Sequence, residues 1–270
     1  MDLPAEMFEF YAGFAEAERL ADGQGGFERV RTQELLERHL PPAPGVVLDV
    51  GGGPGAHALW LAARGYAVHL VDAVPRHVEQ AREASAAAAY PLAGCAVGDA
   101  RELRHADASV DAVLLLGPLY HLIERADRVR ALAEARRVLR PGGVLVAAVV
   151  SRFASLQTCL SLGLLDDAEF VEIIRADLRT GQHRNPTGRP FFTTTFFHRP
   201  ADLRAELADA GFDGARLIAV EGPLMWAPTF GADWADEGKR DLLLELVRTV
   251  EEEEAIVAGG AHFLGIAQLH

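Results

Sequence analysis

The stretch VVLDVGGGPGAHALWLAAR, residues 46–64, decides the fold. An apolar run at 46–50 leads directly into four glycines within five residues, and a helical pattern follows. Glycines let the backbone turn tightly and come close to a ligand, because no Cβ stands in the way. The first N–H groups of the following helix have no partner within that helix and can bind a ligand. The segment therefore predicts a strand, a ligand-binding loop and a helix.

Similar short apolar runs recur along the chain and alternate with helical patterns. Unbroken apolar runs of this kind are typical of strands that are buried on both faces of a parallel sheet. The alternation predicts an α/β fold with a doubly wound, Rossmann-like sheet of seven strands. The predicted strands are 46–50, 67–71, 93–97, 112–116, 144–150, 215–220 and 262–269.

Three segments depart from this alternation. Residues 1–40 contain only helical patterns. Residues 151–199 follow the fifth strand as an insertion, with a predicted helix pair at about 154–164 and 166–178. The regular pattern resumes at Pro200, which is well placed as a first helical residue. Near the C-terminus the leucine and valine spacing predicts one apolar helix face, made of Leu242, Leu243, Leu246, Val247 and Val250.

The acidic composition narrows the range of partners. The chain has 26 Lys and Arg against 39 Asp and Glu, which gives a formal net charge of −13. Proteins that bind a phosphate backbone or an anionic membrane surface normally carry the opposite charge. We therefore expect neither a nucleic-acid partner nor a membrane partner.

The cysteines and the N-terminus indicate the cellular compartment. Cys95 and Cys159 are too few for a disulfide framework, and neither lies in a zinc-ligand pattern, so no metal is predicted. The N-terminus lacks the basic segment and apolar run of a signal peptide. The apolar runs are also shorter than the roughly 20 residues that a membrane span needs. These features predict a soluble, cytoplasmic protein.

Acidic residues at the strand ends indicate the kind of ligand. Gly51, Gly53 and Ala56 satisfy the dinucleotide pattern G-x-G-x-x-G/A. Asp49, two residues before the first of these glycines, would repel a pyrophosphate and favour a cationic group. Asp72 ends the second strand, where an acid can accept both hydroxyls of a ribose. Asp99 follows the third strand and can accept the amine of an adenine.

Taken together, these residues resemble the class I S-adenosylmethionine-dependent methyltransferases of the small-molecule type. The similarity is carried, in order, by VVLDVGGGPG, HLVDAV, VGDARELRHADASVDAVLLLGPLYHL, EARRVLRPGGVLV and HFLGIAQL. It implies a seven-stranded sheet whose last strand is antiparallel, S-adenosyl-L-methionine as the cofactor, and a small-molecule substrate. It further implies four parts: a helical lid at 1–40, a cofactor-binding core at 41–150, a substrate cap at 151–199, and the C-terminal part of the core sheet at 200–270.

The resemblance also assigns cofactor contacts residue by residue. Asp49 is expected near the amino group of the cofactor, Asp72 at the ribose hydroxyls, and Asp99 at the adenine edge. The full implied set is Tyr11, Asp49, Gly51, Gly53, Gly55, Asp72, Ala73, Asp99, Ala100, Leu116 and Gly117.

The acceptor side of the site is less defined by the sequence. His121 follows the fourth strand and has a side chain whose ordinary pKa suits a general base, and Tyr120 beside it is a candidate for lining the methyl channel. Core packing is equally plausible for Tyr120, and for His121 a packing or capping role is favoured over the role of base. Phe14 resembles the N-terminal lid aromatics of the same family. Aromatic and polar residues that suit a small-ligand pocket give the remaining substrate candidates, which are His183, Arg184, Phe192 and Trp226.

Two alternatives remain at this level. A nicotinamide-dependent oxidoreductase would keep the glycine loop and Asp72, but would not require Asp49, Asp99 or the turn at Pro141. A non-catalytic binding protein on the same fold would be expected to have lost glycines from this loop, and here the glycine loop is intact. The acceptor atom, whether oxygen, nitrogen or carbon, and the oligomeric state cannot be read from the sequence.

Overall fold

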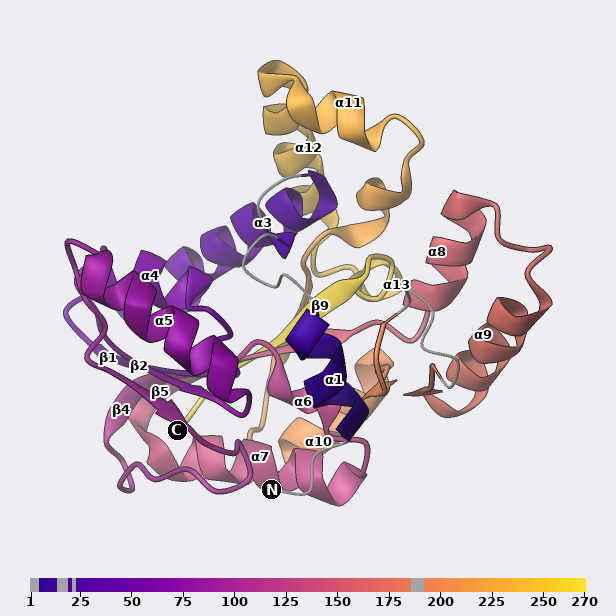
Figure 1. Ribbon diagram of the computed structural model, residues 1–270. Coiled ribbons are helices and arrows are strands. Elements are labelled where there is room, and N and C mark those ends of the chain that lie inside the picture. Colours follow the sequence, from indigo (N-terminus) through magenta and orange to yellow (C-terminus); the bar gives the residue numbers. More distant parts are fainter. Residues whose placement is uncertain (1–4, 14–18, 21–22, 186–191) are drawn as a thin grey trace.

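The computed structural model describes residues 5–13, 19–20, 23–185 and 192–270. Its centre is a seven-stranded sheet with the order β3-β2-β1-β4-β5-β9-β8 (Figure 1). The strands β1 to β5 pair in parallel, and β9 is antiparallel to both of its neighbours. This confirms the predicted Rossmann-like fold with an antiparallel last strand. The strands are β1 (Val46–Val50), β2 (Ala67–Asp72), β3 (Gly94–Val97), β4 (Val110–Leu115), β5 (Leu139–Val150), β8 (Arg216–Ala219) and β9 (His262–Gln268).

Helices cover both faces of the sheet (Figure 1). One face packs against α3 (Gly23–His39), α4 (Ala56–Ala62) and α5 (Pro75–Ala87), whose apolar residues form one core cluster with the strands. The other face packs against α7 (Arg125–Val138) and α10 (Pro200–Asp209), which contribute to a second cluster. The successive residues of each strand point to opposite faces, so strands with two apolar faces are required. The unbroken apolar runs in the sequence meet this requirement.

The insertion after β5 forms a separate helix pair beside the sheet. It consists of α8 (Ala154–Leu162) and α9 (Ala168–Thr180), followed by the two-residue strands β6 (Gln182–His183) and β7 (Thr195–Phe196). Its attachment to the core includes polar contacts, because Arg152 donates to the carbonyl of Phe197 at 2.7 Å and pairs with Asp202 at 2.9 Å. The predicted helix pair is confirmed, with bounds that differ by a few residues.

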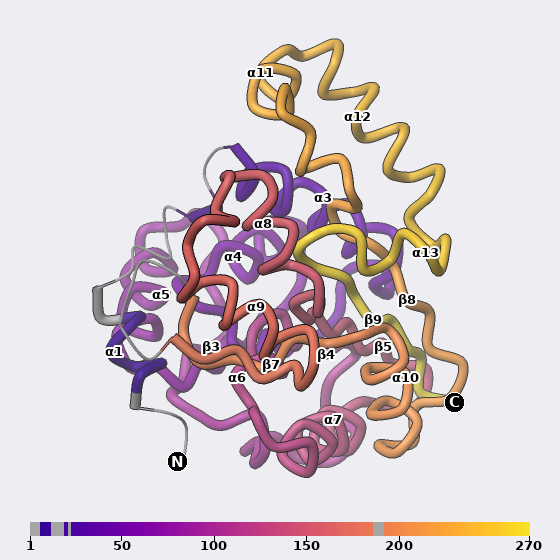
Figure 2. Tube along the Cα trace, turned by 90° about the vertical axis from the view of Figure 1, so that its right-hand side faces the viewer, coloured from indigo at the N-terminus to yellow at the C-terminus, as the bar shows by residue number. Residues whose placement is uncertain are grey.

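A C-terminal lobe projects from the rest of the molecule in two perpendicular views (Figures 1 and 2). It contains η1 (Gly222–Trp226), α11 (Phe230–Ala235) and α12 (Glu237–Val250), and α13 (Glu254–Val257) leads back to β9. The apolar face predicted for this region is only partly right. Leu244 and Val247 of α12 are buried against Phe27 of α3, whereas Leu242 and Leu246 are about half exposed. Within the described residues, no helix is both long and apolar enough to cross a membrane.

Candidate active site

A cavity opens at the C-terminal ends of β1, β2 and β4. The strand order reverses between β1 and β4, and ligands of doubly wound sheets bind in the crevice beside such a reversal. All of the expected cofactor residues except Gly55 line this cavity, and His121 and Tyr120 line it too. The structure therefore brings together residues from five separate segments of the chain. The members from the prediction are Tyr11, Asp49, Gly51, Gly53, Asp72, Ala73, Asp99, Ala100, Leu116, Gly117, Tyr120 and His121.

The glycine loop is shaped by close approaches that a side chain would block. Gly51 has a φ of 72°, and a Cβ there would lie 2.6 Å from Cδ of Pro118. A Cβ on Gly52 would lie 2.7 Å from the Asp49 carboxylate, so this glycine makes room for the acid. Gly55, with a φ of 95°, begins α4 and does not line the cavity. Its role is to turn the chain into the helix.

Asp49 is a buried acid without a partner. Its side chain lines the cavity, and neither carboxylate oxygen has a hydrogen-bond partner among the described residues. Burial, and then the charge of Asp72, raises the pKa of Asp49 to about 7. An unpaired carboxylate inside a protein is costly, and a cationic ligand group would offset that cost. The site therefore fits a positively charged group of a ligand.

Asp72 ties the loop to the end of β2. One carboxylate oxygen accepts the N–H of Gly53 at 2.9 Å, and the other accepts the N–H of Val74 at 2.8 Å. A carboxylate can accept about four hydrogen bonds, so both oxygens keep capacity for ribose hydroxyls. The acid thus positions the loop and remains available to a ligand in the cavity that it lines.

Asp99 is held by a neighbouring arginine. The Arg101 guanidinium donates to it at 3.0 and 2.8 Å and also pairs with Asp127 at 2.7 Å. Burial acts to raise the pKa of Asp99, but the hydrogen bonds from Arg101 outweigh burial and lower it. The residue is therefore an ionised acceptor in a fixed orientation at the cavity wall.

The helix α1 (Ala5–Gly13) covers one side of the cavity. Tyr11 is buried, and its hydroxyl oxygen lies 2.9 Å from Nε2 of His121. His121 belongs to the short helix α6 (Pro118–His121), and burial lowers its pKa to about 4. The imidazole is therefore neutral at physiological pH. The ring of Tyr120 lies beside it, with the ring centres 4.7 Å apart.

The far end of the cavity contains residues that the motif analysis missed. They come from α3, α4, β9, the short segment before α3 and the position directly after β8, and no local pattern in the sequence distinguishes them. Arg19 and Glu28 form a two-bond ion pair there, with distances of 2.5 and 3.1 Å. The missed residues are Arg19, Glu28, Thr32, His57, Val220, His262 and Leu264.

Several predicted substrate residues lie elsewhere. His183 is buried against Asp177 at 2.9 Å and stacks on Phe197, and Arg184 is exposed, so neither lines the cavity. His183 belongs to β6, which pairs with β7 in a separate two-stranded sheet. Trp226 donates to the carbonyl of Gly259 and lines a neighbouring cavity instead.

Phe192 and Phe14 are the two other predicted substrate residues. Phe192 packs within the small cluster that includes Tyr120, and its ring centre lies 6.0 Å from that of His121. It therefore supports the wall formed by these residues. Phe14 lies outside the described residues.

The sheet order and the glycine loop that follows Asp49 are together typical of Rossmann-like methyltransferase domains. The family model of a methyltransferase domain matches residues 47–143. A ubiquinone/menaquinone biosynthesis C-methyltransferase of Acidiphilium cryptum is 31% identical over 199 residues, covering 73% of this chain and 78% of that protein. The chain therefore belongs to the class I S-adenosylmethionine-dependent methyltransferases, enzymes whose cofactor is S-adenosylmethionine.

Other relatives agree with this assignment. An uncharacterized methyltransferase of Mycobacterium tuberculosis is 39% identical over 124 residues, which is 45% of this chain. The match spans about half, 47%, of that relative's length. A solved S-adenosylmethionine-dependent methyltransferase of Methanosarcina mazei has a TM-score of 0.57 at 21% identity, covering 87% of this chain and 96% of that one. One of Thermotoga maritima has a TM-score of 0.59 at 17% identity, covering 98% of each chain.

Proposed function

We propose that this protein transfers the methyl group of S-adenosylmethionine to a small molecule. The observation that carries the proposal is Asp49, a buried carboxylate without a partner in the described chain, at a cavity formed by the glycine loop. A cationic cofactor stabilises this acid, whereas the pyrophosphate of a nicotinamide cofactor would repel it. The methyltransferase family also leaves the nicotinamide-dependent alternative without support.

The cavity residues divide between the parts of such a cofactor. Asp49 would hold the amino group, Asp72 the ribose hydroxyls, and Asp99 with Ala100 the adenine edge. Leu116 and Gly117, after β4, would line the methionine side. When bound, S-adenosylmethionine supplies an activated methyl group on a sulfonium, whose sulfur is already a good leaving group. The protein then has to align the acceptor with the methyl carbon and to exclude water.

Contacts between two segments support a role in excluding water. Thr194, at the end of the insertion, donates to Glu6 of α1 at 2.9 Å, and the rings of Phe10 and Phe192 meet edge to face at 5.6 Å. Because Tyr11 of the same helix contacts His121, α1 joins the insertion to the cavity wall. We infer that these segments close over the cofactor as a lid.

The acceptor is proposed to be a small molecule rather than a nucleic acid. The net charge of −13 opposes binding of a phosphate backbone. Among the relatives, the one in Acidiphilium cryptum is named a C-methyltransferase of quinone biosynthesis, and one in Geobacter sulfurreducens is named a malonyl-[acyl-carrier protein] O-methyltransferase. Carbon and oxygen acceptors therefore both occur among proteins of similar sequence.

Calorimetry with S-adenosylhomocysteine and with NAD tests the cofactor. We expect binding of S-adenosylhomocysteine by the wild type, and strongly weakened binding by Asp49→Ala. Asp213→Ala, in an exposed turn, is the matched control and should bind as the wild type does. Binding of NAD in preference to S-adenosylhomocysteine would overturn the proposal.

A further inference from the structure

A second cavity adjoins the cofactor cavity. The two cavities share Arg19, Glu28 and His262, so these three residues stand where the cavities meet. Any acceptor that approaches the cofactor from the second cavity must pass this junction. The other residues that line the second cavity are Gln24, Gly25, Thr158, Ser161, Leu162, Met225, Trp226 and Ala261.

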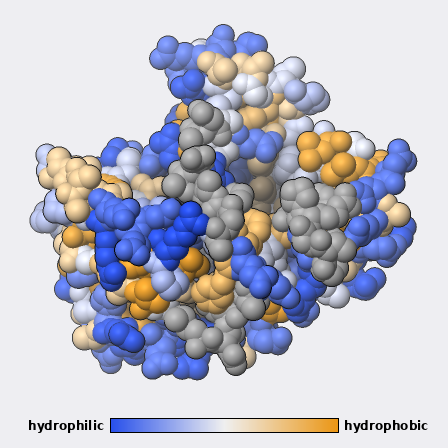
Figure 3. Space-filling model, in the orientation of Figure 1, coloured by the Kyte–Doolittle hydropathy of each residue, from blue (hydrophilic) through white to orange (hydrophobic). Residues whose placement is uncertain are grey.

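The second cavity combines an apolar wall with a few polar groups. Leu162, Met225 and Trp226 supply apolar surface, and Thr158 with Ser161 supplies hydroxyls from α8. Leu160, Leu162 and Leu165 at this end of α8 are more than half exposed, and apolar residues gather on the surface there (Figure 3). Such surroundings suit a ligand with an apolar or aromatic body.

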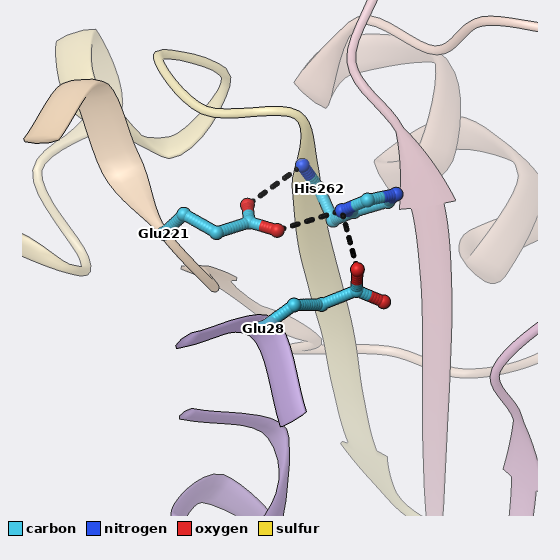
Figure 4. Close-up of side chains that lie close together, drawn as sticks. All are labelled: Glu28, Glu221 and His262. Carbon is cyan, nitrogen blue, oxygen red and sulfur yellow. Dashed lines mark hydrogen bonds and ion pairs between the residues drawn. The ribbon is translucent and has the colours of Figure 1, made fainter. Parts of the chain in front are cut away.

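His262 is held in one orientation at the junction. Glu221, fully buried after β8, accepts the backbone N–H of His262 at 2.9 Å and lies 2.7 Å from its Nδ1 (Figure 4). A carboxylate only accepts hydrogen bonds, so Nδ1 carries a hydrogen. Glu28 approaches the same nitrogen at 3.9 Å.

The other ring nitrogen, Nε2, points away from both carboxylates (Figure 4). His262 lines both cavities, and none of the described residues forms a hydrogen bond with its Nε2. A histidine acts as a general base when an acid orients it through Nδ1 and its Nε2 is free to take a proton.

We propose that His262, oriented by Glu221, is the general base that takes the proton from a phenolic or enolic hydroxyl of an acceptor bound in the second cavity. This inference rests on the proposed methyl transfer. The acceptor O–H gives its proton to Nε2, and the oxygen lone pair forms the bond to the methyl carbon. The carbon–sulfur bond breaks at the same time, and its electron pair stays on sulfur. Glu221 and Glu28 stabilise the resulting imidazolium, which later releases the proton to water.

The charges around His262 match it to an acidic hydroxyl. Burial lowers the pKa of His262, but Glu28 and Glu221 outweigh burial and raise it to about 9, while Arg19 acts in the opposite direction. A phenol, with a reference pKa of about 10, can give its proton to such a base at little cost. His121 is a weaker base, because its pKa is about 4 and its Nε2 already contacts Tyr11.

The test uses acceptors that differ only in the reacting group. Para-substituted phenols, the matching benzyl alcohols and the matching anilines are offered with S-adenosylmethionine, and release of S-adenosylhomocysteine is measured. We expect turnover of the phenols only, with kcat/KM rising with pH up to about 9 because His262 must lose a proton. His262→Gln should lower kcat for phenols by about 10²–10⁴-fold, and the remaining activity should rise with pH only as the phenol itself ionises. The loss should be smaller for the more acidic phenols, which ionise without help.

Two further variants separate a catalytic role from a structural one. Glu221→Gln keeps a hydrogen-bond acceptor but loses the charge, and should move the rising limb to lower pH. His105→Ala, outside both cavities, is the control and should keep the wild-type rate and pH profile. A second readout needs no turnover, because 4-nitrophenol absorbs differently as an anion. With S-adenosylhomocysteine present at pH 6, the wild type should bind 4-nitrophenol as the anion. The His262→Gln variant should bind it as the neutral phenol.

The outcomes distinguish this inference from the proposed function. Binding of S-adenosylhomocysteine by the wild type and by His262→Gln with similar affinity supports the cofactor assignment by itself. Three results would overturn the role of His262 if S-adenosylhomocysteine does bind. They are turnover of anilines or alcohols instead of phenols, absence of turnover of all three series, and an unchanged pH profile in His262→Gln. If the wild type does not bind S-adenosylhomocysteine, the proposed function itself fails.

Discussion

The hydroxyl oxygen of Tyr11 lies 2.9 Å from Nε2 of His121, and this contact joins α1 to α6 across 110 positions of the chain. Both side chains are buried and both line the cofactor cavity. The ring of Tyr11 also meets that of His77 at 5.1 Å, at the start of α5. One side chain of the N-terminal helix thus contacts two different walls of the site, which is what a closing lid requires.

Removal of this hydroxyl should loosen the lid. Tyr11→Phe loses one hydrogen bond, worth about 1 kcal/mol, and keeps the ring contacts. We expect faster hydrogen exchange in residues 5–13 and several-fold weaker binding of S-adenosylhomocysteine. Tyr90→Phe, at an exposed position, should change neither quantity. If S-adenosylhomocysteine leaves exchange in residues 5–13 unaltered in the wild type, the helix does not act as a lid.

Substitution of His121 should affect the rate less than substitution of His262. Burial lowers the pKa of His121 to about 4, so the imidazole is already neutral and is a weak base. His121→Gln is therefore expected to lower kcat less than tenfold and to keep the rising limb that ends near pH 9. A fall of 10²–10⁴-fold together with a changed pH profile would instead identify His121 as the base.

The charge of Asp49 should make stability and cofactor binding depend on pH in opposite directions. Its pKa is raised to about 7 in the folded protein, against about 3.9 when unfolded. Between these values the folded state binds more protons, so its stability falls as pH rises. Asp49→Asn should therefore resemble the wild type at pH 4. Above pH 7 its free energy of unfolding should exceed that of the wild type, by on the order of 4 kcal/mol.

Cofactor binding gives the opposite trend. The ionised carboxylate favours a cationic ligand, so the affinity of the wild type should increase as pH rises towards 7. The affinity of Asp49→Asn should be lower and nearly independent of pH over this range. Denaturant unfolding and calorimetry at pH 4, 6 and 8 measure both effects. Parallel pH curves for the two proteins would show that folding does not raise the pKa of Asp49.

The tight glycine loop allows a matched comparison of two glycines. Gly51 and Gly142 both have positive φ angles, but a Cβ on Gly142 would meet nothing within 4 Å. Gly142→Ala should cost only the backbone strain, about 1–2 kcal/mol. Gly51→Ala should cost more, because its Cβ would lie 2.6 Å from Pro118, and it should abolish binding of S-adenosylhomocysteine. Equal losses of stability and unchanged binding in both variants would contradict the proposed role of the glycine loop in binding the cofactor.

The sequence is least informative where side chains act over long distances. His183 and Arg184 have the residue types of a substrate pocket, yet the chain folds β6 against β7 and keeps both away from the cavity. The apolar residues of α12 show a similar effect. Helical spacing identifies them, but it does not say which of them pack against a neighbouring helix. Contact with Phe27 of α3 turns Leu244 and Val247 inward.

The amino-acid sequence by itself determined the strands, their alternation with helices and the acid-glycine loop, because each depends on residues that are close together in the chain. Strand burial follows from unbroken apolar runs, and the loop needs glycine at positions that exclude a Cβ. Only the tertiary structure decided the far end of the site. Glu28, Glu221 and His262 belong to α3, to the segment after β8 and to β9, and one side-chain nitrogen or oxygen of each lies within 4.8 Å of the others. Their charges act through space, so the pKa of His262 depends on which distant carboxylates the fold places beside it.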